Sequence, residues 1–92
     1  GEVGAYMKER LLELNSPLIK DVRGRGLMIG LELTVEVGPA VEAGYRHGLL
    51  MVNAGTHVIR FVPPLIATKA DVDTLIERLT VILADMGAAA NA

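Results

Sequence analysis

The stretch Gly48-Leu-Leu-Met-Val-Asn-Ala-Gly-Thr-His-Val-Ile-Arg-Phe-Val-Pro-Pro64 decides the fold that this sequence predicts. Apolar and branched residues at 49–52 and 58–62 enclose the segment 53–56, in which asparagine and glycine supply the backbone angles of a tight turn. This pattern predicts a β-hairpin. Its returning strand contains Arg60, whose apolar neighbours indicate burial and whose planar guanidinium matches the two oxygens of a carboxylate. We therefore expect Arg60 to bind a carboxylate.

The residues that precede the hairpin predict two helices and two further strands. Apolar residues at helical spacing predict an amphipathic helix over residues 3–14. Residues 18–33 are rich in branched side chains and are interrupted by Arg23-Gly-Arg-Gly26, which predicts a short strand, a glycine turn and a longer strand. We expect the strand over 27–33 to be central in its sheet. A short helix over 39–48 is predicted from a proline suited to its first turn and a glycine suited to its end.

The last part of the chain predicts a third helix. Thr68 followed by Asp71 is a variant capping box, and apolar residues then recur at three- and four-residue steps as far as Met86. Residues 87–92 show no such periodicity, and we expect them to fray. The chain is therefore expected to form one small domain over residues 1–86.

The order helix, strand, strand, helix, strand, strand, helix is typical of an α+β fold. We expect a small, largely antiparallel four-stranded sheet with helices packed on one face. The hydrophobic content of 51% exceeds what one small core needs, so we expect the other face of the sheet to meet another domain or subunit. The absence of cysteine removes disulfides and thiol chemistry from consideration.

Charge and hydrophobicity narrow the classes of partner. Nine Lys and Arg residues stand against eleven Asp and Glu residues, with a net charge of −2 and no block of one sign. Because a phosphate backbone needs a concentrated positive surface, we do not expect nucleic-acid binding. No apolar run approaches the roughly 20 residues of a membrane-spanning helix. We therefore expect no membrane partner and a cytoplasmic location.

Other polar residues offer weaker candidates for a site. His47 and His57 have no carboxylate at metal-ligand spacing, and Ser16, the only serine, has no histidine placed to serve as its base. Arg23 and Arg25 flank a glycine and suit an anion-binding nest, but a tight turn explains the glycines without a ligand. We expect neither a metal site nor a catalytic residue in this chain.

Several of these segments together resemble a known family. Residues 18–33, Gly48-Leu-Leu50, Ala54-Gly55, Val58-Ile-Arg-Phe61 and Pro63-Pro-Leu65 are similar in order and spacing to the C-terminal small domain of class III aminotransferases, which are fold-type I pyridoxal-phosphate enzymes. The resemblance covers almost the whole chain. We interpret it as greatest to the acetylornithine aminotransferases, with acetyl-lysine enzymes next and ornithine and 4-aminobutyrate aminotransferases more distant. It implies transfer of the terminal amino group of an N-acylated diamino acid to 2-oxoglutarate, in arginine or lysine biosynthesis.

The resemblance also assigns roles to particular residues. By residue match, Arg60 takes the role of binding the α-carboxylate of the amino acid or of 2-oxoglutarate. The Schiff-base lysine of the family belongs to its large domain, and none of Lys8, Lys20 and Lys69 matches it. The resemblance therefore implies a homodimer whose pyridoxal phosphate is bound by a large domain absent from this chain. It implies no cofactor-binding residue here and no transamination by these 92 residues alone.

A second hypothesis comes from a different class of protein. If the 92 residues formed a complete protein, a small α+β chain of this kind would suit an ACT-like regulatory module that binds amino acids as a dimer. The turn Gly24-Arg-Gly26 would then lie at the dimer interface. Binding of acetylornithine, lysine or arginine to the isolated chain would favour this alternative.

Overall fold

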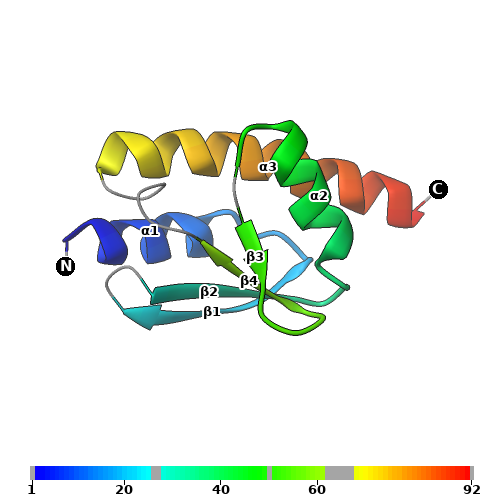
Figure 1. Cartoon of the computed structure of the whole chain (residues 1–92), viewed down its shortest axis with the longest axis horizontal. Coiled ribbons are helices and arrows are strands. Elements are labelled where there is room, and N and C mark those ends of the chain that lie inside the picture. Colours follow the sequence, from blue (N-terminus) through cyan, green and yellow to red (C-terminus); the bar gives the residue numbers. More distant parts are fainter. Residues whose placement is uncertain (1, 26–27, 50, 62–67, 92) are drawn as a thin grey trace.

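The computed structural model describes residues 2–25, 28–49, 51–61 and 68–91. Within these ranges the chain forms three helices and one four-stranded sheet (Figure 1). The elements are α1 (Glu2–Glu13), β1 (Ile19–Arg25), β2 (Met28–Leu33), α2 (Gly38–Arg46), β3 (Met51–Asn53), β4 (Val58–Phe61) and α3 (Lys69–Asn91). The predicted α+β fold and order of elements are confirmed. The expected turn glycine Gly26 and the prolines Pro63 and Pro64 lie outside the described residues.

The sheet is antiparallel, with its strands in the order β1-β2-β4-β3. One row of paired residues runs across all four strands through Val22, Leu31, Ile59 and Asn53. Because β2 and β4 lie in the middle, the prediction of a central strand over residues 27–33 is confirmed. The hairpin of β3 and β4 is also confirmed.

One face of the sheet forms the core with the helices. Successive side chains of a strand point to opposite faces, and the apolar members of β2 and β4 alternate accordingly. All three helices lie on the same side of the sheet in Figure 1. Buried residues from both layers meet there: Met7, Leu11, Val22, Ile29, Leu31, Leu33, Ile59, Phe61, Val72, Leu75 and Leu79. The expectation of helices on one face is therefore confirmed.

The ends of the first two helices follow the local sequence. After α1 the chain reverses at Asn15, which has a φ of 49°, and the Ser16 hydroxyl accepts a hydrogen bond of 3.2 Å from the Leu18 amide. Helix α2 has Pro39 in its first turn, where a missing N–H costs nothing. Gly48 follows that helix with a φ of 77°, a value that glycine adopts without strain.

Helix α3 begins as predicted but extends further. The Asp71 carboxylate accepts from the Thr68 amide at 3.0 Å, and the Thr68 hydroxyl accepts from the Asp71 amide at 3.1 Å, which confirms the capping box. The helix continues past Met86 and Gly87 to Asn91, so the predicted end at Met86 is wrong. One helical glycine costs only about 1 kcal/mol, and the three alanines that follow it are the strongest helix formers.

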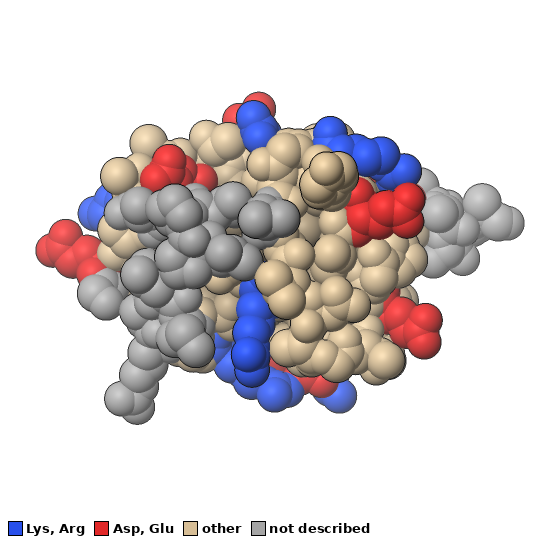
Figure 2. All heavy atoms as spheres, viewed as in Figure 1, with Lys and Arg blue, Asp and Glu red and all other residues tan. Residues whose placement is uncertain are grey.

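The surface carries both signs of charge. Figure 2 shows basic and acidic side chains interspersed on the visible face, with uncharged surface between them. No helix of the described residues is apolar over a length sufficient to cross a membrane.

Candidate functional site

The face of the sheet opposite the helices carries most of the polar side chains of the strands. We call this surface the open face and define it by residues that alternate with the buried ones: Lys20, Asp21, Arg23, Gly30, Glu32, Val52, Val58 and Arg60. One row of this face runs across the sheet through Arg23, Gly30, Arg60 and Val52.

Arg60 lies near the centre of the open face. Its strand neighbours Ile59 and Phe61 are buried against the helices, so the alternation of side chains places Arg60 on the opposite side. Arg60 is exposed, and the expectation that it would be buried is wrong for this chain. Arg60 does not lie on an edge strand, because β4 is paired with β2 on one side and with β3 on the other.

An ion-pair network occupies the half of the open face next to β1. The Glu32 carboxylate pairs with the Arg23 guanidinium and, at 3.7 Å, with the Lys20 ammonium. Arg23 Nε also donates to Asp21 Oδ2 at 3.0 Å. The Glu32 side chain is 16% exposed, against 59% for Arg23 and 64% for Lys20, so Glu32 is the enclosed centre of the network. The carboxylates of Asp21 and Glu32 both pair with Arg23. Because Arg23 already has these partners, its contacts argue against the anion-binding nest considered from the sequence.

Arg60 differs from the cations of that network. Among the described residues no carboxylate forms an ion pair with it. Among the side chains that the structure describes, the open face has the three cations Lys20, Arg23 and Arg60 against the two carboxylates Asp21 and Glu32. The uncompensated positive charge lies on Arg60, which leaves its donor fork available to a carboxylate from outside the chain.

The space beside Arg60 is open because of a glycine. Gly30 pairs directly with Arg60 and separates it from Arg23 in the same row. A Cβ at Gly30 would lie 3.4 Å from Val58 Cγ1, which is an ordinary contact, so packing alone does not require glycine there. The bare backbone at Gly30 leaves room between the two arginine side chains.

A hollow of about 530 Å³ adjoins the network. Its described lining comprises Lys20, Glu32, Leu33, Thr34 and His57. The His57 ring shares a hydrogen bond of 2.8 Å between Nδ1 and the Thr56 hydroxyl. No cluster of three or more metal-ligating side chains occurs in the part of the chain that the structure describes. Lys20 and Glu32 connect this hollow to the open face.

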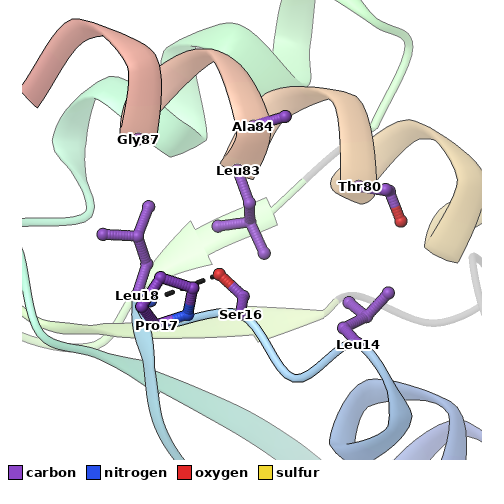
Figure 3. Close-up of a pocket in the computed structure, with 8 residues that line it drawn as sticks. All are labelled: Leu14, Ser16, Pro17, Leu18, Thr80, Leu83, Ala84 and Gly87. Atoms are coloured by element: carbon purple, nitrogen blue, oxygen red, sulfur yellow. Dashed lines mark hydrogen bonds between the residues drawn. The ribbon is translucent and has the colours of Figure 1, made fainter. Parts of the chain in front are cut away.

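A second hollow lies between the turn after α1 and helix α3 (Figure 3). It has a volume of about 320 Å³ and is lined by Leu14, Ser16, Pro17, Leu18, Thr80, Leu83, Ala84 and Gly87. Its described lining is mainly apolar and includes no charged side chain that could bind the ammonium or carboxylate of an amino acid. The open face is consequently the better candidate for an amino-acid site.

A polar cluster joins helices α1 and α3 on the other side of the molecule. The Tyr6 hydroxyl donates to the Asp73 carboxylate, and this hydrogen bond, followed by partial desolvation, raises the pKa of Tyr6 above its ordinary value of 10.0. Arg10 Nε lies 3.9 Å from the same carboxylate, and the Lys69 ammonium lies 5.6 Å from the centre of the Tyr6 ring. Sequence reasoning missed this cluster because Tyr6 and Asp73 are 67 residues apart.

The described residues do not fit a bound pyridoxal phosphate. A lysine that forms a Schiff base must present a free amine in an enclosed site. The Lys20 ammonium is exposed and paired with Glu32, Lys69 lies over the Tyr6 ring, and Lys8 is on helix α1. Neither Lys20 nor Lys69 therefore presents a free amine in an enclosed site.

Comparison with known proteins identifies the family. The sequence profile of the family "Aminotransferase class-III" matches residues 1–83. The ornithine aminotransferase of Brevibacillus brevis is 48% identical over 82 residues, which are 89% of this chain and 21% of that protein. The ornithine aminotransferase of Bacillus subtilis is also 48% identical, over 89% of this chain and 20% of that protein. The chain therefore spans about a fifth of the length of these relatives.

Solved structures agree with the sequence comparison. The N-acetylornithine aminotransferase of Stenotrophomonas maltophilia superimposes with a TM-score of 0.79 at 32% identity, covering 92% of this chain and 25% of that one. The ornithine δ-aminotransferase of Plasmodium falciparum gives a TM-score of 0.81 at 26% identity, over 90% of this chain and 23% of that one.

The sequence predicts ornithine aminotransferases to be more distant than the acetylornithine enzymes, and several bacterial ornithine aminotransferases are 45–48% identical to this chain. The match also favours an aminotransferase over the ACT-like regulatory module. The sequence profile and the relatives together show that this chain belongs to the class III aminotransferase family.

Proposed function

We propose that this chain is the small domain of a pyridoxal-phosphate-dependent aminotransferase and that Arg60 binds the carboxylate of its substrates. The observation that carries the proposal is the position of Arg60: it is exposed in the middle of the open face, and no described carboxylate compensates its charge. An arginine fork fixes both oxygens of a carboxylate, which a single point charge does not.

The contribution of Arg60 is orientation. A substrate whose carboxylate is held at one fixed point presents its other end in a defined direction, and such positioning can supply a large part of a rate enhancement. In 2-oxoglutarate the α-carboxylate is bonded to the reacting carbon, so an arginine that fixes this carboxylate also orients the carbon that accepts the amino group. Binding and orientation are thus the part of the reaction that this chain performs.

The remaining parts of the enzyme lie outside the chain in this proposal. The class III family implies pyridoxal phosphate in the complete protein, where the cofactor supplies the electron sink for amino-group transfer. We propose that a large domain holds it, that the protein acts as a cytoplasmic homodimer, and that this chain, through the end of helix α3, forms the small domain. These 92 residues are then inactive by themselves.

The proposed donor is a diamino acid of the ornithine type. The curated relatives are named ornithine aminotransferases, whereas one structural neighbour is named an N-acetylornithine aminotransferase. We propose transfer of the terminal amino group of ornithine or of its N-acetyl derivative to 2-oxoglutarate. The test is the ratio of kcat/KM for these two donors, measured on the complete enzyme. Preference for N-acetylornithine would support the arginine-biosynthetic role expected from the sequence, and preference for ornithine would support the role of an ornithine aminotransferase.

The role of Arg60 is tested by Arg60→Lys in the complete enzyme. The variant keeps the charge and loses the fork, so we expect KM for 2-oxoglutarate to rise about tenfold or more, as for loss of a hydrogen bond to a charged group. Arg46→Lys is the matched control, because Arg46 is an exposed arginine on α2 that pairs with Glu42. An unchanged KM in Arg60→Lys would remove Arg60 from the site.

A further inference from the structure

Glu32 holds two of the three open-face cations whose side chains the structure describes. Its carboxylate pairs with Arg23 through one oxygen and with Lys20 through the other, and its side chain is the most enclosed of the three. Such a shared carboxylate does more than neutralise charge, because it fixes the direction in which both long side chains lie.

Without that carboxylate, Arg23 would be the nearest alternative cation to Arg60. The two arginines lie in one row on opposite sides of Gly30, two strand spacings or about 10 Å apart at the backbone. Long side chains on one face of a sheet reach such neighbours, and Gly30 places no side chain between them. Arg23 would keep only Asp21, an exposed partner two residues away that competes weakly with a ligand.

We propose that Glu32 is a positioning residue that sets substrate specificity: by holding Arg23 and Lys20, it leaves Arg60 as the one unrestrained cation among the described side chains of the open face. This inference rests on the proposed role of Arg60. An ornithine-type donor carries one carboxylate and an ammonium, whereas 2-oxoglutarate carries two carboxylates. A free Arg23 would repel the donor ammonium and attract the second carboxylate of the acceptor, so a site that serves both substrates needs Arg23 restrained.

The test compares two inhibitors of the complete enzyme that differ by one carboxylate, glutarate and pentanoate. In Glu32→Gln we expect the inhibition constant of glutarate to fall about two- to fivefold relative to that of pentanoate, the size of an exposed ion pair. Glu32→Asp keeps a carboxylate and should keep the wild-type ratio. The double variant Glu32→Gln/Arg23→Gln should return to that ratio, since Arg23 is then absent. A purely structural role of Glu32 would weaken both inhibitors equally and leave their ratio unchanged, which would overturn the inference.

Two further variants keep the test decisive. Arg23→Gln alone should leave the ratio of the glutarate to the pentanoate inhibition constant at the wild-type value, because Glu32 already withholds Arg23. A raised ratio would show that Arg23 binds dicarboxylates in the wild type. That result would overturn the inference even if Glu32→Gln failed to fold. Arg60→Lys should weaken both inhibitors about tenfold. If it weakens neither, the proposed function fails; if it weakens both while Glu32→Gln leaves the ratio unchanged, only the role of Glu32 fails.

Discussion

The two faces of the sheet are built from the same strands but obey different physical rules. On the helix-covered face, Ile29, Leu31 and Ile59 are almost completely buried, and their contribution depends on the volume that they fill. On the open face, Glu32 and Arg60 keep contact with solvent, and their contribution depends on which charge faces which. The comparison teaches that adjacent residues of one strand serve stability and recognition separately, so substitutions on the two faces should have separable effects.

The largest effect should come from a cavity on the covered face. Leu31 is fully buried in the central strand β2, so Leu31→Ala removes packed atoms that the surroundings replace only in part. We expect it to lower the free energy of opening of β2 and β4 by about 2–5 kcal/mol. Amide hydrogen exchange of those strands in the complete protein measures this quantity.

Val52→Ala on the open face is the matched control for that cavity. Val52 is 49% exposed and belongs to the row of Arg60, so its truncation should change the same free energy by less than about 0.5 kcal/mol. Similar losses in the two variants would mean that the open face is also packed in the complete protein, and the contrast between the faces would then apply only to this chain.

A glycine pair sharpens the comparison at the level of the backbone. Gly48 ends helix α2 at a φ of 77°, and an added Cβ would lie 2.9 Å from an Arg78 nitrogen that donates to the His47 carbonyl. We expect Gly48→Ala to destabilise α2 by about 1–2 kcal/mol, seen as faster exchange of its amides.

Gly30→Ala makes the same chemical change on the open face. The new methyl group would meet Val58 Cγ1 at 3.4 Å, without strain, so the exchange of β2 should change little. Its effect should appear in substrate affinity, because the methyl group fills the space between Arg23 and Arg60. Faster exchange in Gly30→Ala than in Gly48→Ala would contradict the distinction between a glycine required by the backbone and one that leaves room.

The sequence predicts the elements better than the contacts between them. Both hairpins and the capping box of Thr68 and Asp71 depend on neighbouring residues, and all three were recognised from the sequence. The exposure of Arg60 was misjudged, although the alternation of Ile59 and Phe61 already indicated that Arg60 faces the other way. The apolar character of the strand predicts burial on both faces, but only the face of Ile59 and Phe61 is buried.

The ion-pair network of the open face could not be predicted in this way. Its pairs depend on the register of β1 against β2, and that register shifts between Ile19 and Asp21. The irregularity brings Lys20 within 3.7 Å of Glu32, while Arg23 approaches the same carboxylate from the regular part of the strand. Hydrophobic alternation specifies which residues share a face, but a one-residue irregularity has no comparable signal in the sequence.

The smallest effect concerns the electrostatics of the helix layer, where Tyr6 and Asp73 join α1 to α3. The hydrogen bond to the Asp73 carboxylate raises the pKa of Tyr6 above 10.0, which favours the protonated hydroxyl in the folded state. Any stability from this pair is therefore fully present below pH 10 and is lost as the pH rises through the folded pKa. The absorbance of tyrosinate, taken as wild type minus Tyr6→Phe in the complete protein, should titrate above pH 10.

Asp73→Asn separates this carboxylate from the rest of the helix layer. It removes the charged acceptor while keeping the size of the side chain, so the Tyr6 titration should move back towards 10.0. Glu32→Gln, which removes a carboxylate from the opposite side of the sheet, should leave that titration in place. A Tyr6 titration that responds equally to both substitutions would mean that the two sides of the molecule are electrostatically coupled. Since exposed charges more than a Debye length apart are largely screened at physiological salt, we expect Asp73, the largest influence on the Tyr6 pKa, to move this titration and Glu32 to leave it unchanged.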